Sequence, residues 1–218
     1  GAARDRLQVA NAVPRRDDVD LVIEAVPEDV TLKRNVLVAI DEFLPAAAVV
    51  ASNTSSLSIS RLADALADPG RFIGMHFFNP VPRSSLIELV IAPTTSEPTL
   101  AAAQHWSQLL GKTTVVVRDS PGFATSRLGV AIGLEAIRML EEQVASAEDI
   151  DAGMTLGYKH PLGPLRLTDM VGLDVRLGIA EHLARELGPR FEPPDLLREM
   201  VRDGKLGQKT GQGFYRWD

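Results

Sequence analysis

The sequence contains no cysteine, and this absence excludes several classes of protein at once. Disulfide scaffolds, thiolate zinc sites, iron–sulfur clusters and enzymes with a cysteine nucleophile all need that residue. No apolar run approaches the roughly 18 residues that a membrane-spanning helix requires, and we expect no signal peptide. The net charge of -6 favours neither nucleic acid nor an anionic membrane as a partner. These absences predict a soluble, cytoplasmic globular protein.

Glycine is scarce in the first third of the sequence. Of the 17 glycines, only Gly1 precedes Gly70, although an α/β protein usually needs glycines in its first turns. The sequence opens on Gly-Ala-Ala without an initiator methionine. We therefore expect that a segment upstream of Gly1 is missing. The length of 218 residues corresponds to roughly one and a half domains.

Short apolar runs alternate with helical patterns in the first half of the chain. The runs at 20–26 and 46–51 are typical of strands covered on both faces, as in parallel sheets. Further strands are predicted at 72–75, 86–91 and 113–117, with helices at 30–44, 57–66 and 97–110. This alternation predicts a doubly wound α/β sheet with right-handed crossovers.

The second half has a helical pattern almost throughout. Helices are predicted at 123–142, at 146–156 with a capping box at Ser146, at 165–187 with an interruption near Gly172, and at 195–203. Only residues 213–217 have an extended pattern. We therefore predict two domains, an α/β domain at 1–118 and an all-α domain at 119–218.

Polar residues follow three consecutive predicted strands. Glu28 comes after the first strand, Asn53 and Ser55 after the second, and His76 after the third. In open parallel sheets, ligands bind beyond the carboxyl ends of the strands. If the strands are neighbours, these side chains converge on one crevice.

His76 and Glu88 form the most informative pair in the sequence. Glu88 stands inside the apolar run LIELVI, where a lone carboxylate would be costly to bury unless it were paired. A carboxylate that orients a nearby histidine makes a general base. The alternatives are a core histidine bonded to the backbone and a Glu88 that faces water at a sheet edge.

Other chemistries are less well supported. Ser55, His76 and Glu88 do not form a hydrolase triad by motif, since no G-x-S-x-G surrounds the serine. The remaining histidines are scattered without a second ligand at i+4, so no metal site is predicted: His105, His160 and His182.

A glycine-rich segment at 204–215 suggests a phosphate loop at first sight. It lacks the G-x-x-x-x-G-K-[ST] spacing and the strand–loop–helix context of such a loop. We interpret it as a turn-rich C-terminal lock that packs Phe214, Tyr215 and Trp217.

Taken together, several motifs resemble the 3-hydroxyacyl-CoA dehydrogenase family, particularly its short-chain bacterial 3-hydroxybutyryl-CoA branch. The motifs are DLVIEAVPE at 20–28, ASNTSS at 51–56, HFFNPVP at 76–82, LIELV at 86–90, DSPGF at 119–123, GPLRLTDMVGLD at 163–174 and LGQKTGQGFY at 206–215. The resemblance implies a Rossmann-like domain without its glycine-rich N-terminal part. It also implies an all-α substrate and dimerisation domain of the 6-phosphogluconate-dehydrogenase C-terminal type.

The resemblance also implies residue roles in the oxidation of an (S)-3-hydroxyacyl-CoA to the 3-ketoacyl-CoA, within fatty-acid β-oxidation. His76 corresponds to the catalytic base and Glu88 to its partner. Ser55 corresponds to the serine that holds the substrate hydroxyl, and Asn79 to the asparagine beside the reacting centre.

NAD is the implied cofactor, with NADP left open, and its nicotinamide side would contact Glu28, Lys33, Asn53 and Ser55. Ser126 stands where many family members have an asparagine that binds substrate. The sequence has no G-x-G-x-x-G turn to hold the pyrophosphate. The implied partners are an acyl-CoA substrate and a second copy of the chain.

Two alternatives stay open beside this interpretation. One is a dehydrogenase of a free hydroxy acid or sugar acid on the same scaffold. The other is a dimerising fragment that binds no dinucleotide and has no catalytic activity.

Overall fold

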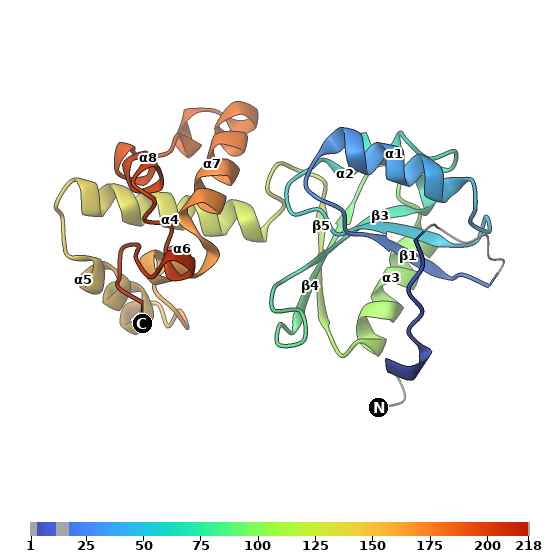
Figure 1. Ribbon diagram of the computed structural model, residues 1–218, viewed down its shortest axis with the longest axis horizontal. Helices are drawn as coiled ribbons and strands as arrows, with labels where there is room; N and C mark the ends of the chain where they lie inside the picture. Colours follow the sequence, from blue (N-terminus) through green and yellow to red (C-terminus); the bar gives the residue numbers. More distant parts are fainter. Residues whose placement is uncertain (1–3, 12–17, 218) are drawn as a thin grey trace. The chain divides into compact units, whose positions relative to one another are not determined.

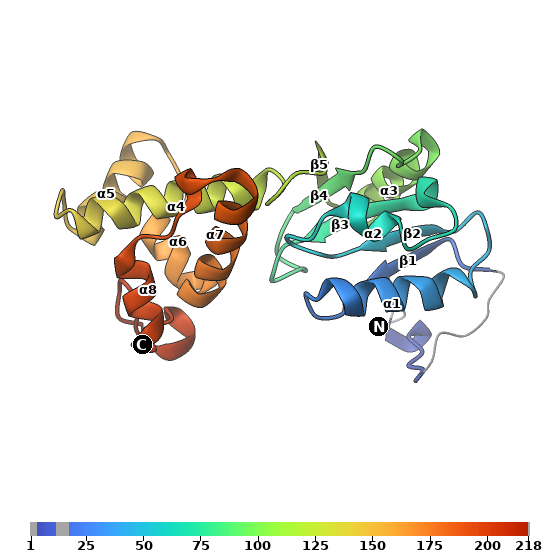
Figure 2. The same ribbon diagram turned by 90° about the horizontal axis from the view of Figure 1, so that it is seen from above.

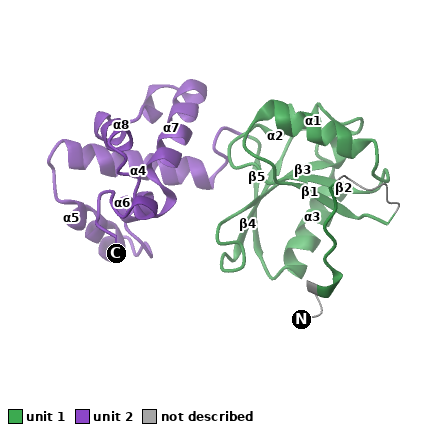
Figure 3. Cartoon of the chain, in the orientation of Figure 1, with its two compact units in different colours: residues 1–119 green, residues 120–218 purple. Residues whose placement is uncertain are grey.

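Two units with separate cores make up the chain, residues 1–119 and residues 120–218 (Figure 3). The computed structural model describes residues 4–11 and 18–217.

Unit 1 contains a five-stranded sheet in which the strands lie in chain order (Figure 1). The strands are β1 (Leu21–Glu24), β2 (Val49–Ser52), β3 (Phe72–Phe77), β4 (Leu86–Ile91) and β5 (Thr113–Arg118). β1, β2 and β3 are parallel neighbours, β4 is antiparallel to β3, and β5 is parallel to β4. The sheet is therefore mixed.

The reversal between β3 and β4 departs from the expected strand–helix alternation. A parallel crossover needs a connection of about a dozen residues or more, usually a helix. The connection at 78–85 is shorter and carries no helix. A connection of this length permits β4 to pair with β3 only in the antiparallel direction.

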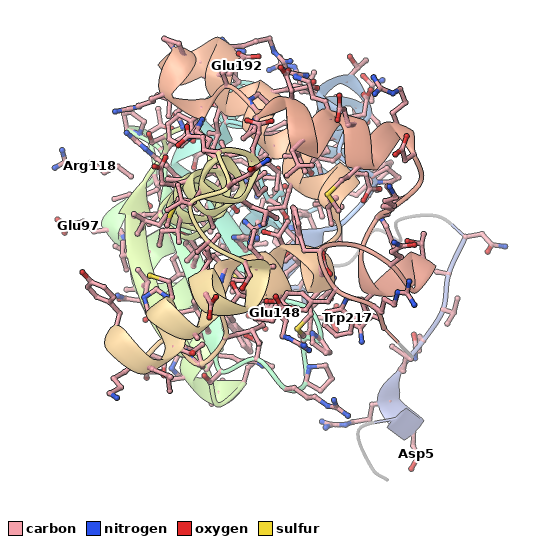
Figure 4. The ribbon with its side chains drawn as sticks, turned by 90° about the vertical axis from the view of Figure 1, so that its left-hand side faces the viewer. Asp5, Glu97, Arg118, Glu148, Glu192 and Trp217 are labelled. Atoms are coloured by element: carbon pink, nitrogen blue, oxygen red, sulfur yellow. The ribbon has the colours of Figure 1, made fainter. Side chains whose placement is uncertain are left out.

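Helices cover both faces of the sheet. α1 (Val30–Asp41) and α2 (Ile59–Ala63) lie on one face and α3 (Glu97–Leu109) on the other (Figures 1 and 2). Short 3-10 turns at Arg4–Arg6 and Pro69–Arg71 complete the unit. Glu97 at the start of α3 and Arg118 at the end of β5 are exposed, and their side chains point away from the rest of the protein (Figure 4).

Side chains alternate between the two faces because successive residues of a strand point to opposite sides. Alternate residues of the central strands form the core under α3: Val49, Ala51, Ile73, Met75, Ile87 and Leu89, with Ala103 from the helix. On the other face, Gly74 lets α2 approach closely. A Cβ there would lie 2.9 Å from Ile59 Cδ1 and 2.8 Å from Val90 Cβ.

Unit 2 is all-helical among its described residues, as predicted. Its helices are α4 (Thr125–Glu141), α5 (Ala147–Ala152), α6 (Pro164–Val171), α7 (Leu173–Leu187) and α8 (Asp195–Arg202), with 3-10 turns at Pro189–Phe191 and Gln208–Thr210. Ser146 accepts a hydrogen bond from Asp149 N, so the predicted cap of α5 is confirmed. The helix predicted to run to Leu156 instead changes to a π-helical turn at Gly153–Gly157. The expected interruption at Gly172 is confirmed, because its φ of 102° separates α6 from α7.

The glycine-rich C-terminal segment packs against unit 2 as a lock. Asp169 is 1% exposed and accepts hydrogen bonds from Phe214 N (2.9 Å), Tyr215 N (2.9 Å) and Trp217 Nε1 (2.8 Å). Tyr215 OH donates to Ala147 O at the start of α5, and Trp217 ends the segment nearby (Figure 4). The predicted packing of the aromatic residues is confirmed. The extended run predicted at 213–217 is wrong, since only isolated bridges occur there.

Candidate active site

His76 and Glu88 face each other across the antiparallel pair β3–β4. The strand register makes them direct partners, which places both side chains on the same face of the sheet. His76 Nδ1 lies 3.0 Å from Glu88 Oε2, and the two residues are 5% and 0% exposed. The sequence prediction ended the third strand at Met75. β3 instead runs to Phe77, so His76 belongs to the ladder itself.

The contact with Glu88 determines which tautomer of the His76 imidazole is favoured. A carboxylate accepts a hydrogen bond, so it selects the imidazole tautomer with hydrogen on Nδ1. That tautomer carries its lone pair on Nε2. The ring of Phe78 packs against the imidazole, with 4.4 Å between the ring centroids. Both the water-facing Glu88 and the histidine bonded only to backbone are therefore excluded.

Asn53 connects the ends of three strands. Its backbone N donates to Glu24 O at the end of β1 (2.8 Å), and its Oδ1 accepts from Phe77 N at the end of β3 (2.9 Å). Phe77 is the neighbour of His76. The side chain of Asn53 therefore fixes the end of the strand that carries the histidine, and its contact with a cofactor stays a prediction.

Glu28 holds the turn that follows β2. Its Oε1 accepts from Thr54 Oγ1 (2.6 Å), Ser55 N (3.0 Å) and Ser56 N (3.0 Å). Burial alone would raise the pKa of Glu28, but these hydrogen bonds and the Lys33 ammonium outweigh it and leave the pKa below 4.5. Glu28 thus fixes the backbone of Ser55, and Ser55 itself is exposed to solvent.

Lys33 is buried although it was predicted as a cofactor contact. The residue is 1% exposed, and its Nζ donates to Glu24 Oε1 (2.8 Å) and Val26 O (2.9 Å). Nζ also lies 3.5 Å from Glu28 Oε2. The sequence prediction did not include Glu24 or Ser52, which donates to Glu24 Oε2 at 2.6 Å. Like Glu88, Glu24 is a carboxylate inside an apolar run of the sequence. The same argument, that such a carboxylate needs a buried partner, could have identified Glu24.

Asn79 and Ser126 are the two remaining predicted residues. Asn79 is exposed in the connection after β3, just before a cis peptide bond to Pro80. Lys112 holds that connection by donating to Val81 O at 2.5 Å. Ser126 is half-buried in the first turn of α4 in unit 2. The roles of Asn79 and Ser126 stay predictions.

The part of the chain that the structure describes contains neither a candidate metal site nor a candidate membrane-spanning helix. Within residues 4–11 and 18–217, no group of three or more His, Asp or Glu side chains could hold a metal ion. No helix in those same ranges has the length and apolar character to cross a bilayer. In the glycine-rich segment, Lys209 Nζ contacts Asp174 Oδ1 at 2.6 Å.

The comparison with known protein families matches both units. Residues 1–120 match the NAD binding domain of 3-hydroxyacyl-CoA dehydrogenase, and residues 122–217 match its C-terminal domain. The chain belongs to the 3-hydroxyacyl-CoA dehydrogenase family. The resemblance drawn from the motifs and the predicted fold class, a Rossmann-like domain followed by a helical domain, are both confirmed.

Individual relatives agree with this membership. The chain is 43% identical over 200 residues to the mitochondrial hydroxyacyl-coenzyme A dehydrogenase of Sus scrofa, covering 91% of this chain and 64% of that protein. It is 40% identical over 215 residues to a probable 3-hydroxybutyryl-CoA dehydrogenase of Bacillus subtilis, covering 98% and 75%. The crystal structure of (S)-3-hydroxybutyryl-CoA dehydrogenase from Ralstonia eutropha is 47% identical, with a TM-score of 0.87 over 91% of this chain and 71% of that chain.

Proposed function

We propose that the protein oxidises (S)-3-hydroxyacyl-CoA to 3-ketoacyl-CoA with NAD, and that 3-hydroxybutyryl-CoA is its substrate. The observation that carries this proposal is the buried His76–Glu88 pair, with Nδ1 and Oε2 3.0 Å apart. The names of the relatives, hydroxyacyl-CoA and 3-hydroxybutyryl-CoA dehydrogenases, support the substrate class.

The residues at the carboxyl ends of β1 and β2 fit the nicotinamide end of NAD. Parallel strands bind ligands at that edge, and Glu28 keeps 38% of its side chain exposed there. Glu28, Asn53 and Ser55 are the residues that would hold the cofactor, and the buried Lys33 would act through its contact with Glu28. When bound, NAD supplies the acceptor for the hydride from carbon 3 of the substrate.

His76 moves the proton in this reaction. Its Nε2 takes the proton of the 3-hydroxyl group, and Glu88 stabilises the imidazolium that results. Because Glu88 is fully buried, its charge acts on the imidazolium with little screening by water. Ser55 Oγ accepts or donates a hydrogen bond at the substrate hydroxyl, and the Asn79 amide donates to the thioester carbonyl.

Replacing the base tests this proposal in the full-length protein. For His76→Gln we expect kcat to fall by roughly 10²- to 10⁴-fold, the usual contribution of a positioned base, with NADH affinity nearly unchanged. NADH formation with 3-hydroxybutyryl-CoA measures the first quantity, and a fluorescence titration with NADH measures the second.

His105→Gln is the matched control, because His105 is exposed on α3 and should tolerate the change. Turnover of His76→Gln near that of the control would contradict the role of the base. Reduction of acetoacetyl-CoA and of free acetoacetate should be compared in the wild-type protein. A faster reaction with the free acid would favour a hydroxy-acid dehydrogenase instead.

We also propose that the protein is a cytoplasmic homodimer that pairs through residues 119–218. Large apolar side chains are exposed on three helices of unit 2, among them Leu128 (63%), Met170 (52%) and Val175 (44%). Burial of such side chains is a common source of dimer stability. Light scattering on the full-length protein should give the mass of a dimer, and Leu128→Arg should shift it toward a monomer.

A further inference from the structure

Glu24 and Ser52 form a buried polar pair at the carboxyl ends of β1 and β2. The two residues are register partners in β1 and β2, and both side chains are fully buried. Ser52 Oγ donates to Glu24 Oε2 at 2.6 Å. A carboxylate removed from water in this way needs strong partners, and the hydroxyl supplies one of them.

The other oxygen of Glu24 holds the Lys33 ammonium. Glu24 Oε1 accepts from Lys33 Nζ (2.8 Å) and from Val26 N (2.6 Å). Lys33 Nζ makes two further contacts, with Val26 O (2.9 Å) and with Glu28 Oε2 (3.5 Å). The ammonium therefore donates hydrogen bonds to Glu24 and to Val26 O, and it forms a longer ion pair with Glu28.

Further hydrogen bonds connect Glu28 back to Ser52 through the turn at 54–56. Glu28 Oε1 accepts from Ser55 N at 3.0 Å and from Thr54 Oγ1 at 2.6 Å. Thr54 N in turn donates to Ser52 Oγ at 3.2 Å. Glu24, Lys33, Glu28, the turn at 54–56 and Ser52 therefore form a closed polar circuit. Only Glu28 and the turn reach the surface.

Charge balance explains why Glu24 matters within this polar circuit. The Lys33 ammonium has two carboxylates near it, Glu24 fully buried beneath it and Glu28 at the surface. If Glu24 lost its charge, Glu28 would be the remaining carboxylate of the circuit. The ammonium would then move toward the surface and carry Glu28 and the Ser55 turn with it.

We propose that Glu24 is a positioning residue for the cofactor end of the site, because its carboxylate fixes Lys33 and, through Lys33, Glu28 and the turn of Ser55. The kinetic part of this proposal rests on the proposed function. The placement of the Lys33 ammonium does not, since the contacts of this chain alone define it.

The first experiment compares two variants of the full-length protein. Glu24→Gln keeps the shape of the side chain and removes its charge, and Asp41→Asn does the same to the buried Arg71–Asp41 pair of the same unit. Both variants should lower Tm, because each removes the nearest carboxylate from a buried cation. Only Glu24→Gln should raise the KM for NAD, by about 10-fold, with a smaller change in kcat.

A merely structural Glu24 would give a different result. Glu24→Gln would then resemble Asp41→Asn, with a lower Tm and an unchanged KM for NAD, and the proposal would be overturned. If Glu24→Gln does not fold, Ser52→Ala decides the question, since it keeps both charges and removes one hydrogen bond to Glu24. We expect a rise in KM of about 2- to 5-fold for Ser52→Ala, and a wild-type KM would again overturn the proposal.

The second experiment needs neither cofactor nor substrate. An amine-acylating reagent and peptide mass spectrometry measure how fast the Lys33 amine reacts in the folded protein. We expect slow labelling in the wild type and in Asp41→Asn, and labelling at least about 10-fold faster in Glu24→Gln. Equal rates would overturn the proposal. If Glu24→Gln labels faster than the wild type but the wild type shows no activity with 3-hydroxyacyl-CoA, the proposed function fails and the positioning of Lys33 by Glu24 stands.

Discussion

Glu28 combines partial exposure with an unusually large number of hydrogen-bond donors for one carboxylate. Its Oε1 accepts from Thr54, Ser55 and Ser56, all from a single turn. These contacts favour the ionised form over the neutral acid. The side chain therefore couples its charge to the conformation of the turn that presents Ser55.

The pH dependence of stability should report this coupling. Because the folded-state pKa of Glu28 lies below 4.5, its stabilising effect is complete above that value and is lost as the pH falls through the folded pKa. We expect Glu28→Gln to have a lower Tm than the wild type at pH 7. Between pH 6 and pH 3 the variant should lose less Tm than the wild type does.

Thermal unfolding at each pH measures this difference, and the exposed Glu42→Gln serves as the control for a general loss of negative charge. Parallel curves for the wild type and Glu28→Gln would contradict the coupling.

Arg176 in α7 is a buried cation of a different kind. The residue is 7% exposed, and burial lowers its pKa to about 10. Among the described residues its Nε has no hydrogen-bond partner, and its Nη1 would lie 3.2 Å from a Cβ at Gly129. Gly129 thus provides the space that the guanidinium occupies against α4.

Replacing Arg176 with an apolar residue of similar length should stabilise the protein. We expect Arg176→Met to raise the free energy of unfolding by about 1–3 kcal/mol, because the buried charge disappears while the packing stays. Urea unfolding measures the change, with the exposed Arg185→Met on the same helix as control. A lower stability for Arg176→Met than for the control would contradict the expectation.

Individual residues differ in how well the sequence predicts them. Glu88 was predicted because a carboxylate in an apolar run needs a partner, and the structure supplies His76. Lys33 was assigned by resemblance alone, and its burial was not predicted. A lysine in a helix normally extends to solvent, so only the position of Glu24 beneath α1 reveals that this one turns inward.

At the scale of elements, the bounds of the helices and strands were predicted to within a few residues. The antiparallel direction of β4 was not predicted. Apolar periodicity depends on local burial, so it identifies β3 and β4 equally well whether they run parallel or antiparallel. The length of the connection at 78–85 was the only signal for the reversal. The π-helical turn at Gly153–Gly157 likewise has no periodic signature, because it is one turn long.

The C-terminal lock shows why a glycine-rich segment need not bind phosphate. Gly213 lies directly against the buried carboxylate of Asp169, and a Cβ there would stand 2.1 Å from Asp169 Oδ1. Gly207 has a φ of 92°, and a Cβ there would lie 2.2 Å from Asp169 O. These glycines allow the backbone to wrap around one acidic side chain.

A methyl group added at Gly213 should therefore displace the C-terminal segment from Asp169. We expect Gly213→Ala to lower the free energy of unfolding by about 2–4 kcal/mol, since it displaces Asp169 from its three donors. Gly178→Ala in α7 is the matched control, because a Cβ there meets nothing within 4 Å. The control should be stabilised by about 0.5–1 kcal/mol through its higher helix propensity. Equal effects of the two substitutions, measured by denaturant unfolding, would contradict the tight packing at Gly213.

At the scale of the whole molecule, each unit has its own core. The core of unit 2 comes entirely from residues beyond Ser120, including Leu134, Ile137, Leu165 and Leu183, and Phe214 and Tyr215 of the lock pack against it. A unit that buries its apolar side chains against one another has what it needs to fold separately.

Residues 120–218 should therefore fold when expressed alone. We expect a helical circular dichroism spectrum and a cooperative thermal transition for this fragment. Gly213→Ala in the fragment should lower its Tm as it does in the full-length protein, and Gly178→Ala should not. A fragment without a cooperative transition would show that unit 2 depends on unit 1.

The antiparallel pairing of β3 with β4 has a consequence for how this enzyme family can vary. His76 and Glu88 are partners in a backbone ladder, so the strand register sets their distance. A slip of one residue would turn Glu88 to the face of α3 and abolish the pair. A change in the length of the connection at 78–85, which carries Asn79, would leave the ladder intact. In the proposed reaction, the proton-transfer pair is therefore held by the sheet and the Asn79 contact by a loop, so the two can change independently.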